Sequence, residues 1–556
     1  MLPHSIKEKK ILIFLLILLL MSIVNSYTDE VILKNKNIIK GTIIEESDEK
    51  IILQNEESQF TIKRTDILTI KKDTIYYYDD KTTKTLIAHS FVLPEFIAWR
   101  LPKFDENNTS CFPFIGKKFS NIPEVLWIFR AEGLIDLSSI VTDILFDKES
   151  FNIILGDQDG NVYCLNSLKG TIIWKKKING LIDLASPRLF DVNEDGKPEV
   201  LVGGKSLFAL NDKDGSILWE NNMDESQPAG FGAGKIKATE DTVIFAGNLN
   251  PPYQIFLING KTGKTIWKKE TIGKIISHPI FVDVDNSGEK KIIFSVNILD
   301  KASRAKLICI GKNGDIAWTF SAEPSEEQLT FKPKEFSDIY DFSFISPVSS
   351  DFNSDSQNDI LWGTDLNLYL ISDKGNLIWK TPTGIKGNSI IEFHLGNGKI
   401  IFTDSGVQIR DVAIDSPLNK NLPIKIAYGL SSDSRMVTYE NSRKFKYKDV
   451  KIMNKFCILD SKNGTKIWDY ENPPNKTDCP FEMAHPIFVD LNGDFIRDII
   501  ILSSDLSIYG VDGQTHKEIF KLPLLFPSGR YLSLTYFKEN LYLFFTMNTM
   551  LFCAKF

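Results

Sequence analysis

The feature that most constrains the fold of this chain is a repeat built around tryptophan, which begins near residue 124 and continues to the last residues. Tryptophan recurs at positions 127, 174, 219, 267, 318, 379 and 468, and Phe520 extends the series. Most intervals are close to 45–51 residues, which is enough for four short strands and their turns. Repeats of this length with four strands each are typical of β-propeller blades.

Most of these tryptophans follow the same short phrase, of which "ALNDKDGSILW" and "LINGKTGKTIW" are the clearest copies. The phrase predicts a hairpin, because Asn or Asp can cap a turn with its side chain and Gly adopts the positive φ that the turn needs. The strand after the turn carries the Trp, whose large ring can cover the neighbouring blade.

Counting the repeats predicts how the ring closes. Trp127 lies in "VLWIF", which has no inner strands before it, whereas "YLSLTYF", "NLYLFFT" and "TMLFCAKF" at the C-terminal end have no Trp strand after them. The two parts would complete one blade, and closure by terminal strands removes the exposed edges of an open ring. We therefore predict an all-β chain with an eight-bladed propeller over residues 124–556. The extra length around 320–341 and 406–450 is expected to form surface loops.

The first 123 residues are expected to form three further segments. A basic start with Lys7, Lys9 and Lys10 precedes an apolar run at 11–24, which is typical of a signal peptide and short for a membrane span. We expect residues 1–26 to be removed, which makes the protein secreted or periplasmic; an uncleaved anchor is the alternative. The pattern of residues 27–78 predicts a small SH3-like or Sm-like barrel, and we expect residues 79–123 to form a linker. The barrel strands are expected at Glu30–Leu33, Ile38–Ile44, Lys50–Leu53, Phe60–Lys63 and Ile67–Ile70.

Charge and cysteine content exclude some classes of protein. The net charge of -7 argues against a nucleic-acid binder that relies on overall positive charge. Six cysteines in 556 residues do not make a disulfide scaffold. Cys164, Cys309 and Cys457 lie in apolar runs and are expected in the core, whereas Cys111 and Cys479 could pair in an oxidising compartment. We expect a monomer that has no membrane span once the signal peptide is removed.

A second pattern marks possible metal sites. Three repeats carry oxygen-bearing side chains at positions 1, 3, 5 and 9 of a loop that follows a Pro and a short strand: Asp191, Asn193, Asp195 and Glu199; Asp351, Asn353, Asp355 and Asp359; Asp490, Asn492, Asp494 and Asp498. The carbonyl at position 7, in Lys197, Gln357 or Ile496, would add a ligand. Calcium takes six to eight oxygens in irregular geometry, so we predict about three structural Ca²⁺ sites. The alternative is an Asp-rich and Asn-rich turn without an ion.

A fourth copy departs from this pattern. Asp283, Asp285 and Ser287 are present, but position 9 is Lys291. An ammonium there can neutralise the acidic pair without a metal, so we expect this loop to be metal-free.

Catalytic motifs are missing from the sequence. It contains no HExxH, GxSxG or P-loop pattern. His278 and His485 share one repeat position, directly before a Pro, and could approach the central channel. Other repeats have Ser at this position, which favours a role at the start of a strand. We therefore predict no catalytic and no cofactor-binding residues.

The tryptophan phrases resemble the tryptophan-docking motif of the quinoprotein alcohol dehydrogenase-like propellers, which have eight blades. The acidic loops resemble the calcium loops of FG-GAP or VCBS-type repeats. The first resemblance implies either a non-catalytic scaffold, such as those of outer-membrane barrel assembly, or an enzyme. The enzymes hold pyrroloquinoline quinone (PQQ) near the channel, and many have adjacent cysteines, which this chain lacks. We expect a scaffold that binds a protein or glycan, with a PQQ-dependent dehydrogenase as the alternative.

Overall fold

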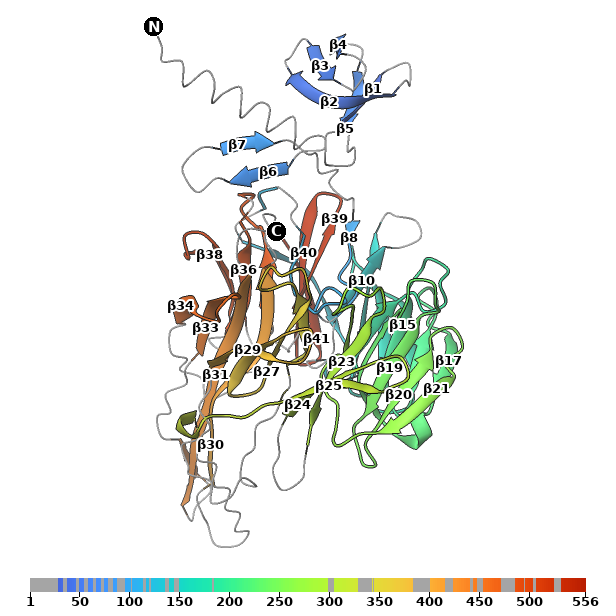
Figure 1. The fold of residues 1–556 in the computed structure, drawn as a ribbon, viewed down its shortest axis with the longest axis vertical. Helices are drawn as coiled ribbons and strands as arrows, with labels where there is room; N and C mark the ends of the chain where they lie inside the picture. Colours follow the sequence, from blue (N-terminus) through green and yellow to red (C-terminus); the bar gives the residue numbers. More distant parts are fainter. Residues whose placement is uncertain are drawn as a thin grey trace. The chain divides into compact units, whose positions relative to one another are not determined.

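The computed structural model divides into two compact units, Met1–Pro94 and Glu95–Phe556 (Figure 1). In the first unit it describes seven strands between residues 29 and 87. In the second it describes residues 96–556 apart from short gaps and longer ones at 145–149, 299–304, 329–342, 384–400, 416–423, 448–453, 472–485 and 525–531. The apolar run at 11–24 lies outside the described residues. Among the residues that are described, no helix has the length and apolar character to cross a membrane.

The first unit contains a five-stranded sheet in the order β4-β3-β2-β1-β5. Its strands begin and end within two residues of the predicted positions: β1 (Asp29–Leu33), β2 (Ile38–Glu46), β3 (Lys50–Gln54), β4 (Gln59–Lys63) and β5 (Ile67–Lys71). A separate hairpin joins β6 (Ile75–Tyr78) to β7 (Lys84–Ile87). The five strands were predicted correctly, and their closure into a barrel stays a prediction.

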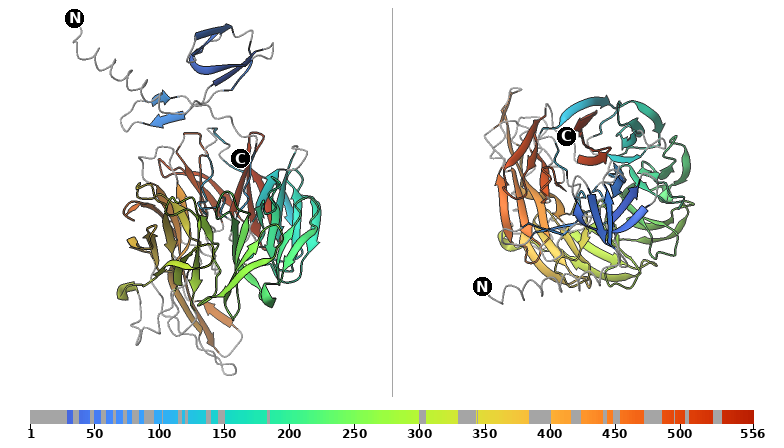
Figure 2. Two further views of the ribbon diagram at one scale, coloured as in Figure 1. Left: turned by 45° about the vertical axis from the view of Figure 1, so that its right-hand side comes forward. Right: turned by 90° about the horizontal axis from the view of Figure 1, so that it is seen from above.

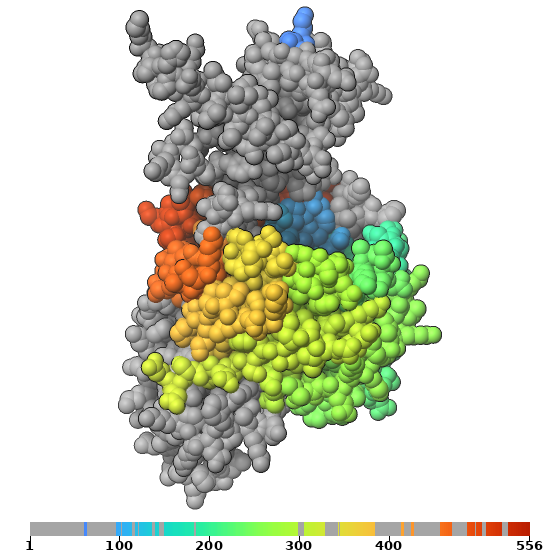
Figure 3. Space-filling model, in the orientation of Figure 1, coloured from blue at the N-terminus to red at the C-terminus, as the bar shows by residue number. Residues whose placement is uncertain are grey.

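The second unit is an eight-bladed propeller, and the right-hand view of Figure 2 shows its blades arranged in a ring. Blade 1 consists of β10–β13 (Val141–Ile144, Phe151–Gly156, Asn161–Asn166, Ile172–Lys177) and blade 2 of β14–β17 (Arg188–Phe190, Glu199–Gly203, Leu207–Leu210, Ile217–Asn221). Blade 3 consists of β18–β21 (Pro228–Gly234, Val243–Asn248, Gln254–Asn259, Thr265–Glu270) and blade 4 of β22–β25 (Ile280–Val282, Lys291–Asn297, Ala305–Ile310, Ile316–Ser321). Successive blades follow one another from green to orange in Figure 3.

Blades 5 to 8 continue the ring in chain order. Blade 5 consists of β26–β29 (Val348–Ser350, Asp359–Gly363, Asn367–Ile371, Leu377–Pro382). Blade 6 consists of β30, β31, β33 and β34 (Ile401–Asp415, Lys425–Glu440, Asn454–Asp460, Lys466–Glu471), and β32 (Lys444–Tyr447) pairs with β31. Blade 7 consists of β35–β38 (Ile487–Val489, Asp498–Ser503, Ser507–Val511, Glu518–Pro523), and blade 8 consists of β39–β41 (Leu532–Phe537, Asn540–Met547, Met550–Lys555) together with β8 (Phe96–Ile97) and β9 (Glu124–Arg130).

The prediction of a surface loop at 406–450 is wrong in part, because β30 and β31 pair over most of their length.

The ring closes as the sequence predicts. Strand β9 is the outer strand of blade 8 and pairs with β41, the last strand of the chain, with Trp127 opposite Cys553. The inner side of the same blade gains an additional strand, β8, which pairs with β39. One blade therefore joins strands from both ends of the propeller, and no blade of the ring is left as an open edge.

The tryptophans join each blade to the next one. The indole N–H donates to a turn carbonyl of the following blade in six pairs, at 2.7–2.9 Å. The ring also covers the turn glycine of that blade; Gly263, for example, has a φ of 68° and lies under Trp219. In the last such contact His516 replaces the glycine with a φ of 59°, and Trp468 stacks on its imidazole at 4.1 Å. The covering role predicted for Trp is confirmed.

Candidate functional site

The three predicted metal loops occupy the same place in their blades. Each joins the first strand to the second, in blades 2, 5 and 7. Position 9 is the first residue of the second strand, where Glu199, Asp359 and Asp498 pair with the last residue of the first strand. Because position 1 directly follows that first strand, strand pairing brings positions 1 and 9 close together.

Backbone hydrogen bonds hold loops 191–199 and 351–359 in nearly the same conformation. In loop 191–199, the Asp191 carboxylate accepts from the backbone N–H groups of Asp195 and Gly196, at 3.1 and 2.9 Å. Asp195 accepts from Lys197 N–H at 2.9 Å. Loop 351–359 repeats these three bonds at 3.0, 3.0 and 2.8 Å. Such bonds are expected of an Asp-rich turn with or without an ion, so they do not separate the two interpretations.

The carboxylates at position 9 are the unusual part of each loop. Glu199, Asp359 and Asp498 are 5%, 1% and 0% exposed. Burial, together with the nearby loop carboxylates, raises the pKa of each to about 7. A buried carboxylate with acidic neighbours costs free energy at neutral pH unless a positive charge is close to it. Each of the three loops therefore contains a buried carboxylate whose ionised form a nearby cation would stabilise.

Asp359 gives the strongest indication. Neither of its carboxylate oxygens has a hydrogen-bond partner. The backbone N–H groups of Phe352 and Asn353 lower its pKa but do not reach hydrogen-bond geometry. The side-chain oxygen of Gln357 is also buried without a partner. Buried polar groups in native proteins are nearly always satisfied, and three unsatisfied acceptor oxygens in one short loop fit the oxygen-only ligand set of calcium.

The other two carboxylates accept hydrogen bonds from their own blades. Glu199 accepts from Val192 N–H at 2.9 Å and from the Asn193 amide at 2.6 Å. Asp498 accepts from Leu491 N–H at 2.8 Å and from Gly513 N–H at 3.0 Å. These bonds offset part of the burial cost, so the case for an ion is stronger at loop 351–359.

The fourth loop has the same backbone arrangement and a different charge. Asp283 accepts from Ser287 and Gly288 N–H at 3.0 and 2.7 Å. Lys291 occupies position 9 as the first residue of β23. The hydrogen bond from Ser287 and, more weakly, the charge of Lys291 lower the pKa of Asp285. A cationic side chain thus stands where the other loops carry a buried carboxylate.

Within the described part of the chain, no group of three or more His, Cys, Asp or Glu side chains is arranged to hold a metal ion. The predicted ligand sets also use Asn side chains and a backbone carbonyl, and apart from Asp359 their carboxylates here accept backbone hydrogen bonds. Calcium binding therefore stays a prediction.

The second feature of interest is a segment that runs through the middle of the ring. Residues 96–119 were placed in the predicted linker, yet they bond to the first strands of six blades. Main-chain bonds link Trp99 to Thr142, Arg100 to Leu189, Asn107 to Ser349 and Thr109 to Ile414, and Phe112 to Phe488, while β8 pairs with β39. First strands from opposite sides of a propeller converge at its axis, so this segment, which we call the channel segment, fills the central channel.

The channel segment is packed as a part of the core. Trp99 and Phe112 are fully buried and stack on each other with ring centroids 6.4 Å apart. Arg497 of blade 7 donates from Nε to the carbonyl of Phe112 at 3.0 Å, and its Nη1 donates to buried Asp415 at 2.8 Å. The aromatic content of residues 96–112 was the sequence signal for this role, because an exposed linker rarely carries so many aromatic residues.

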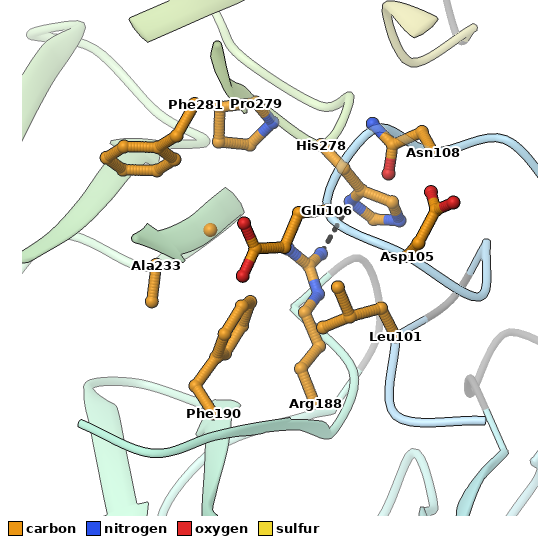
Figure 4. Close-up of a pocket in the computed structure, with 11 residues that line it drawn as sticks. Leu101, Asp105, Glu106, Asn108, Arg188, Phe190, Ala233, His278, Pro279 and Phe281 are labelled. Carbon is orange, nitrogen blue, oxygen red and sulfur yellow. Dashed lines mark hydrogen bonds between the residues drawn. The ribbon is translucent and has the colours of Figure 1, made fainter. Parts of the chain in front are cut away.

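A pocket remains between the channel segment and blades 2, 3 and 4 (Figure 4). Its polar wall contains Arg188, which is buried and donates to Nδ1 of His278. The Arg188 guanidinium also lies 4.0 Å from the ring centroid of Phe231. The remaining lining residues are Leu101, Asp105, Glu106, Asn108, Phe190, Gly232, Ala233, Pro279 and Phe281.

Two of these side chains show what the sequence could and could not indicate. His278 lies beside the channel as the sequence allowed, and its backbone N–H donates to Ser346 Oγ at 3.0 Å, which agrees with a role at the start of a strand. Asp105 is held by Thr109, whose N–H and hydroxyl donate to it at 2.9 and 2.6 Å.

His485 and Cys479 lie outside the described residues. Cys111, Cys164, Cys309 and Cys457 are buried.

Comparisons with known proteins agree with the propeller. The family described as outer membrane protein assembly factor BamB matches residues 124–280 and 203–385. Tetrathionate hydrolase of Acidithiobacillus ferrooxidans is 30% identical over 118 residues, which are 19% of this chain and 23% of that protein. The chain thus spans about a quarter of the length of this relative.

Similar solved structures include two dehydrogenases. The quinohemoprotein alcohol dehydrogenase from Comamonas testosteroni has a TM-score of 0.58 at 10% identity, over 83% of this chain and 80% of that one. A europium-containing methanol dehydrogenase has a TM-score of 0.56 at 10% identity, over 83% and 98%. At this identity the likeness concerns the fold. The chain carries a propeller of PQQ-like repeats, a fold related to both dehydrogenases and BamB-type scaffolds.

Proposed function

We propose that this protein is a calcium-stabilised propeller that acts as an interaction scaffold outside the cytoplasm. The observation that carries the proposal is the channel segment. In quinone dehydrogenases of the resembled superfamily, the cofactor lies near the channel, and here the axis is packed with buried Trp99 and Phe112. Side chains packed into the channel leave less space there for a quinone ring, which favours the scaffold over the dehydrogenase.

Calcium would contribute stability in this proposal. Loops 191–199, 351–359 and 490–498 would each hold one ion through side-chain oxygens at positions 1, 3, 5 and 9 and a carbonyl at position 7. The ion would supply the positive charge that the buried carboxylate at position 9 lacks. Because the loops join strands within blades, the ions would fix the ends of the first strands, which contact the channel segment.

The extracytoplasmic location rests on the basic and apolar start of the sequence and on the match to an outer membrane assembly family. That family's description also supports a protein rather than a glycan as the partner. The monomeric state is an expectation that size-exclusion chromatography with light scattering can check.

Reconstitution with PQQ separates the two functions. The full chain is incubated with PQQ and Ca²⁺, desalted, and examined for quinone absorbance and for reduction of an artificial electron acceptor with alcohols. We expect neither bound quinone nor acceptor reduction. Stoichiometric quinone retention with substrate-dependent reduction would overturn the scaffold and establish the dehydrogenase. Retained quinone without reduction would show that the channel admits the cofactor and would remove the observation that carries the proposal.

A further inference from the structure

The pocket between the channel segment and blades 2, 3 and 4 plays no part in the proposed function, and its lining divides into two halves (Figure 4). One half is polar and contains the guanidinium of Arg188 and the carboxylate of Glu106. The other half is apolar and contains Phe190, Ala233 and Phe281. A ligand that fits both halves needs a charged head and an apolar body.

The positive charge of the pocket belongs to Arg188. Its side chain is 2% exposed, and its Nη2 donates to Nδ1 of His278. Because arginine has only donors, Nδ1 must be the acceptor, so the imidazole is neutral and carries its proton on Nε2. Arg188 is therefore the cationic group that a ligand meets here, and guanidinium groups bind carboxylates through charge-assisted hydrogen bonds.

The negative charge that a ligand can use belongs to Glu106. The neighbouring Asp105 is occupied by its own turn, because its carboxylate accepts from Asn107 N–H at 3.1 Å and from Thr109 N–H and hydroxyl at 2.9 and 2.6 Å. Glu106 has a side chain that is 57% exposed, and it contacts Lys290 Nζ at 3.4 Å. An exposed ion pair of this kind is weak, so the ammonium group of a ligand can compete for the carboxylate.

Charge and size together define the class of ligand. A simple anion would meet the carboxylate of Glu106, and a simple cation would meet the guanidinium of Arg188, whereas a zwitterion pairs with both. The pocket has about 330 Å³ of free space, which includes its part open to solvent. This is the low end of the range of about 300–1,000 Å³ for small-molecule sites. The lining therefore suits a zwitterion about as large as one amino acid.

We propose that this pocket binds a free α-amino acid with an apolar side chain. The α-carboxylate bonds to Arg188, the α-ammonium bonds to Glu106, and the side chain packs against Phe190 and Phe281. Because the lining comes from the channel segment and from the first strands of three blades, the bound amino acid joins the segment to the ring. This inference adds a small-molecule site to the proposed scaffold and does not depend on calcium binding.

Isothermal titration calorimetry of the full chain, purified without amino acids and kept in Ca²⁺, tests the assignment with three related probes. L-leucine has both charged groups, 4-methylpentanoate lacks the ammonium, and 3-methylbutan-1-amine lacks the carboxylate. A charge-assisted hydrogen bond contributes about tenfold or more to affinity, so each analogue should bind at least about tenfold more weakly than leucine. A thermal-shift screen of the apolar amino acids comes first, and if another one gives a larger shift, it and its analogues replace the leucine series.

Glu106→Gln tests the ammonium contact, because Gln keeps the size of the side chain and removes its charge. Leucine should bind this variant about tenfold more weakly, whereas 4-methylpentanoate, which has no ammonium, should bind it as it binds the wild type. The matched control is Glu240→Gln, which removes an acid that pairs with Lys312 at 2.8 Å and does not line the pocket. Arg188 is buried, so its contact is tested through 3-methylbutan-1-amine rather than through a substitution that risks unfolding the chain.

Three outcomes would overturn the inference. The first is that no apolar amino acid binds at millimolar concentration. The second is that either analogue binds as tightly as leucine, which would show that one charged group is enough. The third is that leucine affinity is unchanged in Glu106→Gln, or falls equally in Glu240→Gln, which would place the site elsewhere. Calcium binding and the scaffold are tested separately and stand or fall independently of these results.

Discussion

Replacing Asp359 by Asn should change stability in opposite directions with and without calcium. In the metal-free protein, burial and the acidic neighbours raise the pKa of this carboxyl from 3.8 to about 7. A folded-state pKa above the unfolded value means that the group stabilises the fold at low pH. This contribution is lost as the pH rises from about 4 through 7. At pH 8 the ionised group costs about 4 kcal/mol relative to the unfolded chain, at about 1.4 kcal/mol per pKa unit.

Asn at position 359 carries no charge and avoids this cost, although its buried amide still lacks partners and costs about 2 kcal/mol. The metal-free variant should therefore be about 2 kcal/mol more stable than the wild type at pH 8. The advantage should fade toward pH 5, where the wild-type carboxyl is protonated in the folded state. With Ca²⁺ the wild type should gain stability at this loop and the variant should not.

Equilibrium urea unfolding followed by tryptophan fluorescence, at pH 5 and pH 8, with Ca²⁺ or with chelator, measures these differences. Asp355→Asn is the matched control, because it removes a ligand of the same loop from an exposed position. It removes one acidic neighbour of Asp359 but leaves the buried charge in place, so it should stabilise the metal-free protein less than Asp359→Asn does. The reasoning is refuted if Asp359→Asn destabilises the metal-free protein at pH 8, or if the variant keeps the full calcium gain of the wild type.

Three further substitutions and one control substitution test other parts of the account. In Gly263→Ala the new Cβ would lie 2.5 Å from the Trp219 ring at a φ of 68°, so thermal unfolding should show a loss of about 3 kcal/mol. Gly311→Ala, with no atom within 4 Å of its Cβ, should stay within about 0.5 kcal/mol of wild type; equal effects would contradict the covering role of Trp. Trp127→Ala should cost about 3 kcal/mol in the same assay, because it loosens the closing blade; a neutral result would argue against closure by β9. Lys291→Glu should add one bound calcium ion by metal analysis, and an unchanged count would show that position 9 does not decide binding.

The architecture of the ring was predictable because its signals are local and repeated. The spacing of Trp127, Trp174 and Trp219 follows from one blade per repeat, and the turn glycines follow from the positive φ that each hairpin needs. The unpaired strands at the two ends of the propeller left one way to complete a blade. The one turn without glycine could also be recognised from the sequence, because His516 stands where the other turns have Gly. In the structure, Trp468 stacks on its imidazole.

The site was predictable only in part. Loop spacing identified Asp359 and its equivalents, but not their burial or raised pKa, because these depend on how neighbouring blades pack. The channel segment was missed because its partners come from six blades that are far apart in the sequence. Arg188 was missed for the same reason, since its contacts with His278 and Phe231 join three blades. No periodicity marks such contacts.

The most direct test of the proposed calcium role is the number of calcium ions bound per chain. The full chain is treated with chelator, dialysed against buffer with a known Ca²⁺ concentration, and analysed by elemental analysis and by native mass spectrometry. Three ions per chain are expected, one for each loop with a buried carboxylate at position 9, and two in Asp359→Asn. A chain that binds no calcium at millimolar concentration, with an unchanged melting temperature, would contradict the account.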